Sequence, residues 1–170
     1  MGIPFYQVDV FTDHIFGGNP LAVFTQGQDF KEEDLQKVAR EMNLSETPFV
    51  YPSTSKEADF NVRIFTPNSE IPFAGHPTLG TAYVLRKYGP TTENPLRLNF
   101  KAGVIPVSTE GDRSFMQHPP AEILHELIPS KMIAEALGIP LSSLDGKLPI
   151  KVATTGFPAL FVPVNSLSII

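Results

Sequence analysis

The sequence predicts an α+β fold in which short strands surround a buried helix. Segments with alternating apolar and polar residues recur along the chain, for example at 60–65, and this alternation is typical of half-buried strands. A helical segment at 77–88 carries no charged residue between Leu79 and Leu85, and a helix that is apolar on every face is buried on every face. Proline is about twice as frequent as usual, at 17 of 170 residues, which favours many turns and short strands.

The N-terminal segments predict a hairpin followed by an amphipathic helix. Residues 5–11 and 21–24 have strand patterns, and the turn-forming residues 17–20 join them. A helix is expected from about 31 to 42, with Asp29 as its cap and acidic residues in its first turn, where the helix dipole favours negative charge. Apolar residues at helical spacing predict one face that packs on a sheet: Leu35, Val38, Ala39 and Met42.

The middle of the chain predicts further strands and the buried helix. Residues 49–51 lie between Pro48 and Pro52, so this strand is short or lies at a sheet edge. In the buried helix, Pro77 suits the first helical position and Gly89–Pro90 suits the end. Small residues in this helix allow strands to approach it closely: Gly80, Thr81 and Ala82.

The remaining residues predict more strands and one more helix. Residues 96–100 and 104–108 form a strand pair, and 114–117 form another strand. A second amphipathic helix is expected at 131–137, followed by two strands within 152–164.

A faint internal repeat indicates two lobes. Residues 18–24 are similar to residues 156–162, and we expect an N-terminal lobe at 1–120. Residues 121–170 then comprise a linker helix and the truncated start of a second lobe. The strands within 159–164 would have unpaired edges unless another chain covers them.

The composition excludes several functional classes. Lys and Arg number 13 and Asp and Glu number 18, and the net charge of −5 gives no attraction for nucleic acid or an anionic membrane surface. The absence of cysteine excludes disulfides, thiolate metal sites and cysteine nucleophiles. No stretch reaches the roughly 18–20 apolar residues of a membrane span, and the N-terminus lacks the features of a secretory signal. We therefore expect a soluble, cytoplasmic protein.

The histidines and glycines lack the usual metal and cofactor motifs. His14 lies in a turn, His118 and His125 flank a proline-rich stretch, and none forms an H-E-x-x-H or similar ligand pair. The glycines form neither a dinucleotide fingerprint nor a Walker A loop, and no G-x-S-x-G elbow occurs. We therefore expect no metal and no organic cofactor.

The first of two clusters suited to chemistry is 43–48. Here Glu46 lies beside Leu44 and close to Phe49, and partial desolvation of a carboxylate favours general acid–base chemistry. A loop carboxylate that accepts backbone hydrogen bonds or pairs with an arginine explains the same pattern, and the residues alone favour this structural role.

The second cluster, 72–78, precedes the buried helix and contains His76. A helix N-terminus disfavours an additional positive charge, so we expect a neutral imidazole. The backbone N–H groups of Thr78 and Leu79 can hold a carboxylate, and Gly75 lets a ligand approach the backbone. A histidine that only caps the helix is an equally good interpretation of the residues alone.

Around these clusters the sequence resembles the phenazine-biosynthesis PhzF-like family, a branch of the diaminopimelate-epimerase-like superfamily. The resemblance covers residues 4–89 in order, and 131–164 resembles the family's linker helix and the opening strands of its second lobe. The motifs that carry it are YQVDVFT at 6–12, GNPLAV at 18–23, AREMNLSET at 39–47, IFTP at 64–67 and PFAGHPTLG at 72–80.

The resemblance implies two similar lobes, each a β-barrel around a central helix, with the active site between them. It implies an isomerase in which Glu46 is the acid–base residue; the best-known relative moves a proton between carbons of a cyclic dihydro-hydroxyanthranilate. It further implies that His76 and the backbone of Gly75 orient the substrate and its carboxylate. The lack of cysteine agrees with this branch, because the epimerase and racemase relatives use two thiols. Further substrate-binding residues are expected at Pro77, Thr78 and Asn19.

Two functions remain open at this point. The first is a PhzF-like isomerase that acts on a small cyclic or amino-acid-like carboxylate without a metal or organic cofactor. The second is a non-catalytic binding or interaction protein, because the acidic residue and the Gly/Ser-rich loop of the family's second lobe are not found in this chain. A homodimer, or a partner that supplies the missing lobe, is expected from the resemblance and the exposed strand edges.

Overall fold

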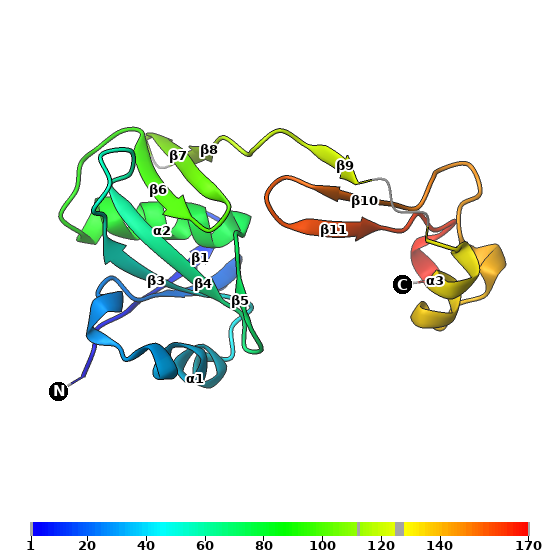
Figure 1. Ribbon diagram of the computed structural model, residues 1–170, viewed down its shortest axis with the longest axis horizontal. Coiled ribbons are helices and arrows are strands. Elements are labelled where there is room, and N and C mark those ends of the chain that lie inside the picture. Colours follow the sequence, from blue (N-terminus) through cyan, green and yellow to red (C-terminus); the bar gives the residue numbers. More distant parts are fainter. Residues whose placement is uncertain (1, 112, 125–127, 170) are drawn as a thin grey trace. The chain divides into compact units, whose positions relative to one another are not determined.

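The computed structural model describes residues 2–111, 113–124 and 128–169, and the chain forms two compact units, Met1–Gln117 and His118–Ile170 (Figure 1). The N-terminal unit contains, in chain order, β1 (Tyr6–Val10), β2 (Asn19–Val23), the 3-10 helix η1 (Gly27–Asp29), α1 (Glu32–Met42), β3 (Thr47–Pro52), β4 (Phe60–Phe65), β5 (Glu70–Ile71), α2 (Gly75–Tyr88), β6 (Leu96–Phe100), β7 (Gly103–Glu110) and β8 (Arg113–Met116). The C-terminal unit contains β9 (Glu122–Leu124), α3 (Ser130–Leu137), the 3-10 helix η2 (Leu141–Ser143), β10 (Lys151–Thr154), β11 (Pro158–Phe161) and the 3-10 helix η3 (Leu167–Ile169).

The strands of the N-terminal unit wrap around α2. One sheet has the order β3-β4-β6-β7-β8, with β5 paired to β4, while β1 and β2 form an antiparallel pair. A bridge between Phe24 and Phe49 connects the two sheets; the Phe24 N–H donates to the Pro48 carbonyl (3.0 Å) and the Val50 N–H donates to the Phe24 carbonyl (2.8 Å). Because α2 contacts β1, β2, β3, β6, β7 and β8, it lies on the inner side of the curved sheets (Figure 1).

The alternation of side chains along β3 places the two helices on opposite faces of the sheet. Phe49 packs in one apolar cluster with Leu35 and Ala39 of α1, whereas the next residue, Val50, belongs to the cluster that surrounds α2. Figure 1 accordingly shows α1 on the outer face. This arrangement confirms the predicted amphipathic helix, whose partly buried residues Val38 and Met42 join the same cluster.

The predicted cap of α1 was wrong. Lys31 is the N-cap residue and makes no side-chain cap hydrogen bond, while Asp29 is the last residue of η1. Between them, Phe30 packs edge-on against Phe24 and Phe49, with ring centroids 5.2 Å from each. The packing of this ring determines the direction in which the chain enters α1. Local capping residues in the sequence do not contain that information.

The inner helix approaches the β1–β2 pair closely at Gly80. A Cβ atom at this position would lie 2.5 Å from Leu21 Cδ2 and 2.8 Å from Val10 Cγ2. Such separations are too short for any side chain, so only glycine permits this packing. The prediction that small residues in this helix allow the strands to approach it closely is confirmed at Gly80.

The inner helix starts earlier and is less enclosed than the sequence predicts. It begins at Gly75 with Ala74 as its N-cap, so Pro77 is the third helical residue and not the first. Because none of the first three helical N–H groups has an intrahelical acceptor, proline fits either start equally well. Tyr83 is 36% exposed and accepts a hydrogen bond from Lys87 Nζ (2.6 Å), so the helix is not buried on every face.

The C-terminal unit has a small apolar interior. Its strands form an antiparallel sheet with the order β11-β10-β9, and β11 is exposed along its whole length. Among the described residues after Gln117, the buried hydrophobic side chains are those of Ile133 and Ala134 on α3. The predicted helix at 131–137 and the strands within 152–164 are present, whereas β9 was not predicted.

Candidate functional site

The packing of β2, β3 and α2 brings three of the predicted site residues together. Glu46 lies between α1 and β3, after Asn43 ends α1 in the left-handed conformation (φ 51°), which asparagine tolerates better than most residues. His76 is the second residue of α2, and Asn19 is the first residue of β2. Although the three are far apart in sequence, α2 contacts both β2 and β3 and so joins them in one site.

A chain of polar contacts runs through this site. Glu46 Oε2 lies 3.4 Å from His76 Nε2, and Asn19 Nδ2 lies 3.2 Å from His76 Nδ1 on the other side of the ring. The Ser45 hydroxyl donates a hydrogen bond to Asn19 Oδ1 (3.3 Å). No role was predicted for Ser45, although its position next to Glu46 within the 43–48 cluster was a signal.

Two polar atoms at the centre of the site are buried and unsatisfied. Within the described part of the chain, neither Glu46 Oε2 nor His76 Nε2 has a hydrogen-bond partner, because their mutual contact lacks hydrogen-bond geometry. The side chains of His76 and Glu46 are only 8% and 19% exposed. Buried polar groups are normally paired, so two adjacent unpaired ones are the expected signature of a site that pairs them with a ligand.

Burial determines the charge of the imidazole. Desolvation lowers the pKa of His76, and the nearby Glu46 carboxylate opposes this by favouring the protonated ring. The lowered pKa keeps His76 neutral at pH 7, and the N-terminal end of α2 acts in the same direction because it repels positive charge. The site therefore combines a carboxylate with a neutral imidazole.

The remaining predicted residues lie in the first turn of the same helix. Pro77 and Thr78 are buried, and the Thr78 hydroxyl donates to the Ala74 carbonyl (2.8 Å). The Thr78 N–H also donates to the Ala74 carbonyl (3.4 Å), so the prediction that this N–H group is available to hold a carboxylate was wrong. Because α2 starts at Gly75, the first-turn N–H groups that lack an intrahelical acceptor are those of Gly75 and His76.

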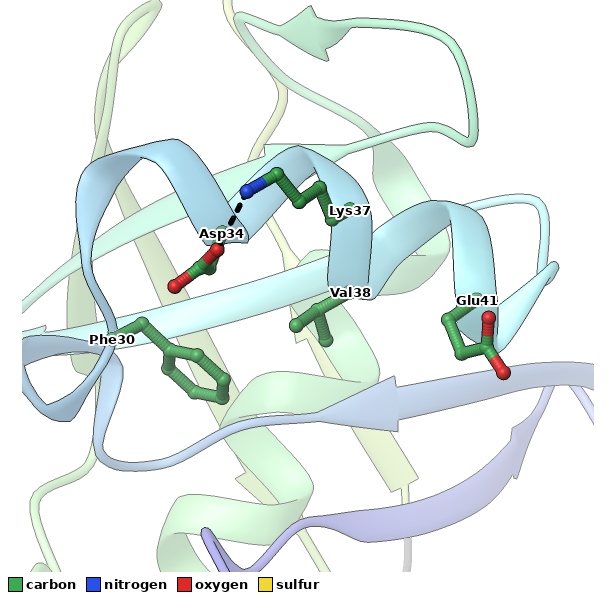
Figure 2. Close-up of a pocket in the computed structure, with 5 residues that line it drawn as sticks. All are labelled: Phe30, Asp34, Lys37, Val38 and Glu41. Carbon is green, nitrogen blue, oxygen red and sulfur yellow. Dashed lines mark hydrogen bonds and ion pairs between the residues drawn. The ribbon is translucent and has the colours of Figure 1, made fainter.

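A surface groove elsewhere does not include these residues. Figure 2 shows it along α1, lined by Phe30, Asp34, Lys37, Val38 and Glu41. Within it, Lys37 and Asp34 form an ion pair at 2.9 Å, and Glu41 is exposed to solvent. It therefore lacks the unpaired buried groups that mark the Glu46–His76 site.

The other histidines that the structure describes, His14 and His118, do not belong to a metal-binding cluster. His14 contacts Asp13 at 3.2 Å on an exposed turn, and His125 lies outside the described residues. Across the residues that the structure describes, no three His, Asp or Glu side chains are grouped so as to hold a metal ion. Over the same residues, no helix combines the length and the apolar character needed to cross a bilayer.

Comparison with known proteins identifies relatives along nearly the whole chain. A family model described as phenazine biosynthesis-like protein matches residues 8–170. An uncharacterized isomerase of Pasteurella multocida is 36% identical over 167 residues, which cover 96% of this chain and 56% of that protein. A trans-2,3-dihydro-3-hydroxyanthranilate isomerase of Pseudomonas aeruginosa is 37% identical over 166 residues, covering 95% and 57%. The chain thus spans little more than half the length of these curated relatives.

Solved structures agree with this relationship. The Bacillus anthracis phenazine biosynthesis protein of the PhzF family has a TM-score of 0.76 and 31% identity, over 97% of this chain and 56% of that chain. A probable proline racemase of Agrobacterium radiobacter, with a TM-score of 0.55 and 13% identity over 85% of this chain and 48% of that chain, shows the shared epimerase-like fold alone. Given the family match and these identities, the chain belongs to the phenazine biosynthesis-like (PhzF) protein family.

Proposed function

We propose that Glu46 and His76 form the acid–base part of an isomerase site that acts on a small cyclic or amino-acid-like carboxylate. The observation that carries this proposal is the adjacent pair of buried, unsatisfied atoms, Glu46 Oε2 and His76 Nε2. The isomerase names of relatives that match along the chain support the reaction class. The activity belongs to the whole family architecture, of which this chain spans little more than half.

In the proposed reaction, Glu46 carries the proton. Its carboxylate removes a proton from a carbon next to an unsaturated or carbonyl-like group and returns it to another carbon on the same face of the substrate. One C–H bond breaks and another forms, so the substrate undergoes no net oxidation or reduction. Proton transfer alone completes this step, and the proposal includes neither a metal nor an organic cofactor.

The start of α2 is the proposed binding site for the carboxylate of the substrate. The unpaired N–H groups of Gly75 and His76 and the positive end of the helix dipole favour an anion there. At Gly75 a Cβ atom would meet only Met116 Cε, at 3.2 Å, so glycine leaves the backbone accessible to a ligand. Pro77, Thr78 and Asn19 are proposed to complete or support this binding region.

Replacement of Glu46 by glutamine tests the proposal. The substrate named for the Pseudomonas aeruginosa relative, trans-2,3-dihydro-3-hydroxyanthranilate, is the first probe, with deuterium uptake from heavy water measured by mass spectrometry. The Glu46→Gln variant should lose about 10²–10⁴-fold in exchange rate while keeping the fold, because it removes the proton carrier and leaves the volume unchanged. Glu41→Gln, which removes an exposed glutamate of α1, is the matched control and should retain the rate.

Equal exchange by wild type and Glu46→Gln would contradict the assigned role. Saturable binding of small carboxylates by the wild type without any exchange would instead favour the non-catalytic binding protein.

The oligomeric state can be tested alongside these variants, because we propose that a second copy or a partner covers the exposed β11. Light scattering across a concentration series, together with turnover, would show whether association is required for activity.

A further inference from the structure

The orientation of the Asn19 amide decides which nitrogen of His76 carries the proton. With Nδ2 of Asn19 facing Nδ1 of His76 at 3.2 Å, the amide donates, so Nδ1 must present a lone pair. In a neutral imidazole the other nitrogen, Nε2, then carries the hydrogen. His76 is kept neutral by burial, so a single tautomer follows from this one contact.

Ser45 holds the amide in that orientation. Its hydroxyl donates to Asn19 Oδ1 at 3.3 Å, which is the atom that would face the imidazole if the amide rotated by half a turn. Rotation would place Oδ1 against Nδ1 and require the hydrogen to move to Nδ1. Nε2, which lies 3.4 Å from Glu46 Oε2, would then carry a lone pair in place of a hydrogen, and these two close, electron-rich atoms would repel each other.

We propose that Ser45 is a positioning residue which, through the Asn19 amide, holds His76 as the tautomer protonated at Nε2, so that the ring presents a hydrogen-bond donor beside the Glu46 carboxylate. The proposal rests on the isomerase function proposed above. It adds to that function by assigning separate roles to the side chains of His76 and Glu46. His76 donates a hydrogen bond to an oxygen of the substrate, and Glu46 alone moves the proton.

The tautomer can be measured without any substrate. In the 170-residue chain labelled with ¹⁵N-histidine, two-bond proton–nitrogen correlation spectra distinguish the two tautomers and the imidazolium, and His76→Gln identifies the His76 signals. At pH 8 the wild type should show the hydrogen on Nε2. Ser45→Ala should transfer a measurable fraction to Nδ1, whereas Ser45→Thr, which keeps the hydroxyl, should restore the wild-type spectrum.

Asn19→Asp provides a stronger and independent perturbation. A carboxylate can only accept, so it requires a proton on Nδ1 of His76, either in the neutral ring or in the imidazolium. Ser53→Ala is the control, because Ser53 is a half-buried loop serine whose hydroxyl donates to the Ser55 carbonyl (3.3 Å), and this substitution should leave the His76 signals unchanged. An unprotonated Nδ1 in Asn19→Asp, or a Ser45→Ala spectrum identical to wild type, would overturn the proposal.

Measurements of substrate turnover distinguish a failure of the Ser45 proposal from a failure of the proposed isomerase function. If the wild type exchanges deuterium, Ser45→Ala should lower kcat about tenfold with little change in KM, as is typical of residues that orient another functional group. Unchanged kcat in Ser45→Ala would overturn the positioning role. If the wild type shows no exchange, the isomerase proposal fails, while the spectra still decide whether Ser45 and Asn19 set the tautomer.

Discussion

His76 resists protonation because its ring is buried, and this links the candidate site to the stability of the protein. The pKa of the folded-state imidazole lies below its ordinary value of 6.5, mainly through desolvation and in spite of the Glu46 carboxylate. As pH falls toward and below 6.5, the unfolded chain takes up a proton at this histidine more readily than the folded chain does. The contribution of His76 to stability is therefore present above this pH and is lost on acidification.

The first prediction at the residue scale concerns this pH dependence. Between pH 7.5 and 5.5 the free energy of unfolding of the wild type should fall by more than that of His76→Gln, measured by urea denaturation. His14→Gln, at an exposed position, serves as the control and should follow the wild type. Equal decreases in the wild type and His76→Gln would show that burial does not shift the titration of His76.

At the scale of elements, regular patterns predicted most of the fold. The spacing of apolar residues along the chain was enough to predict α1 and β4. Strands β5 and β9 contain too few residues to show any such spacing. The exposure of Tyr83 depends on which faces of α2 the strands cover, and no local pattern contains that information. The residue patterns indicated the clusters that contain Glu46 and His76, and the family resemblance implied their roles. The contact of Ser45 with Asn19 follows instead from how β2 meets β3.

The close packing of α2 on β1 and β2 leads to a prediction at this scale. In an isolated helix Gly→Ala is favourable by about 1 kcal/mol, since alanine has the higher helix propensity. At Gly80 the added Cβ meets Leu21 Cδ2 at 2.5 Å, so we expect Gly80→Ala to lower stability by about 1–3 kcal/mol in urea denaturation. Gly146→Ala, where no atom lies within 4 Å, should change stability by about 0.5 kcal/mol or less. A stabilised Gly80→Ala variant would contradict the packing described above.

At the scale of the whole molecule, the apolar interior is unevenly divided. Both clusters of buried side chains in the N-terminal unit draw all their members from residues before His118. In the described part of the C-terminal unit, large apolar side chains such as Phe157, Leu160 and Phe161 are exposed. Hydrophobic burial is the main driving force of folding, so stability should reside almost entirely in the N-terminal unit.

This asymmetry predicts the behaviour of the separated units. Residues 1–117 alone should unfold cooperatively in urea, at a midpoint close to that of the full chain. Residues 118–170 alone should show no cooperative transition, because a segment of this length with so small a core is below the usual limit for independent folding. Circular dichroism and one-dimensional NMR spectra distinguish these outcomes. Non-cooperative unfolding of 1–117 would show that its core needs residues from the C-terminal unit.

The parallel pairing of β4 with β6 has a consequence for how the candidate site forms during folding. The connection between these strands contains α2, so the pairing of Phe60 with Leu98 closes a loop that includes this helix. Closing so long a connection is entropically costly, and that cost is recovered only when the helix is buried as well. The turn that bears His76 lies within this connection, so we expect its contact with Glu46 to form together with the closure of the sheet. We therefore expect the candidate site to form late in folding, together with the parallel pairing of β4 and β6.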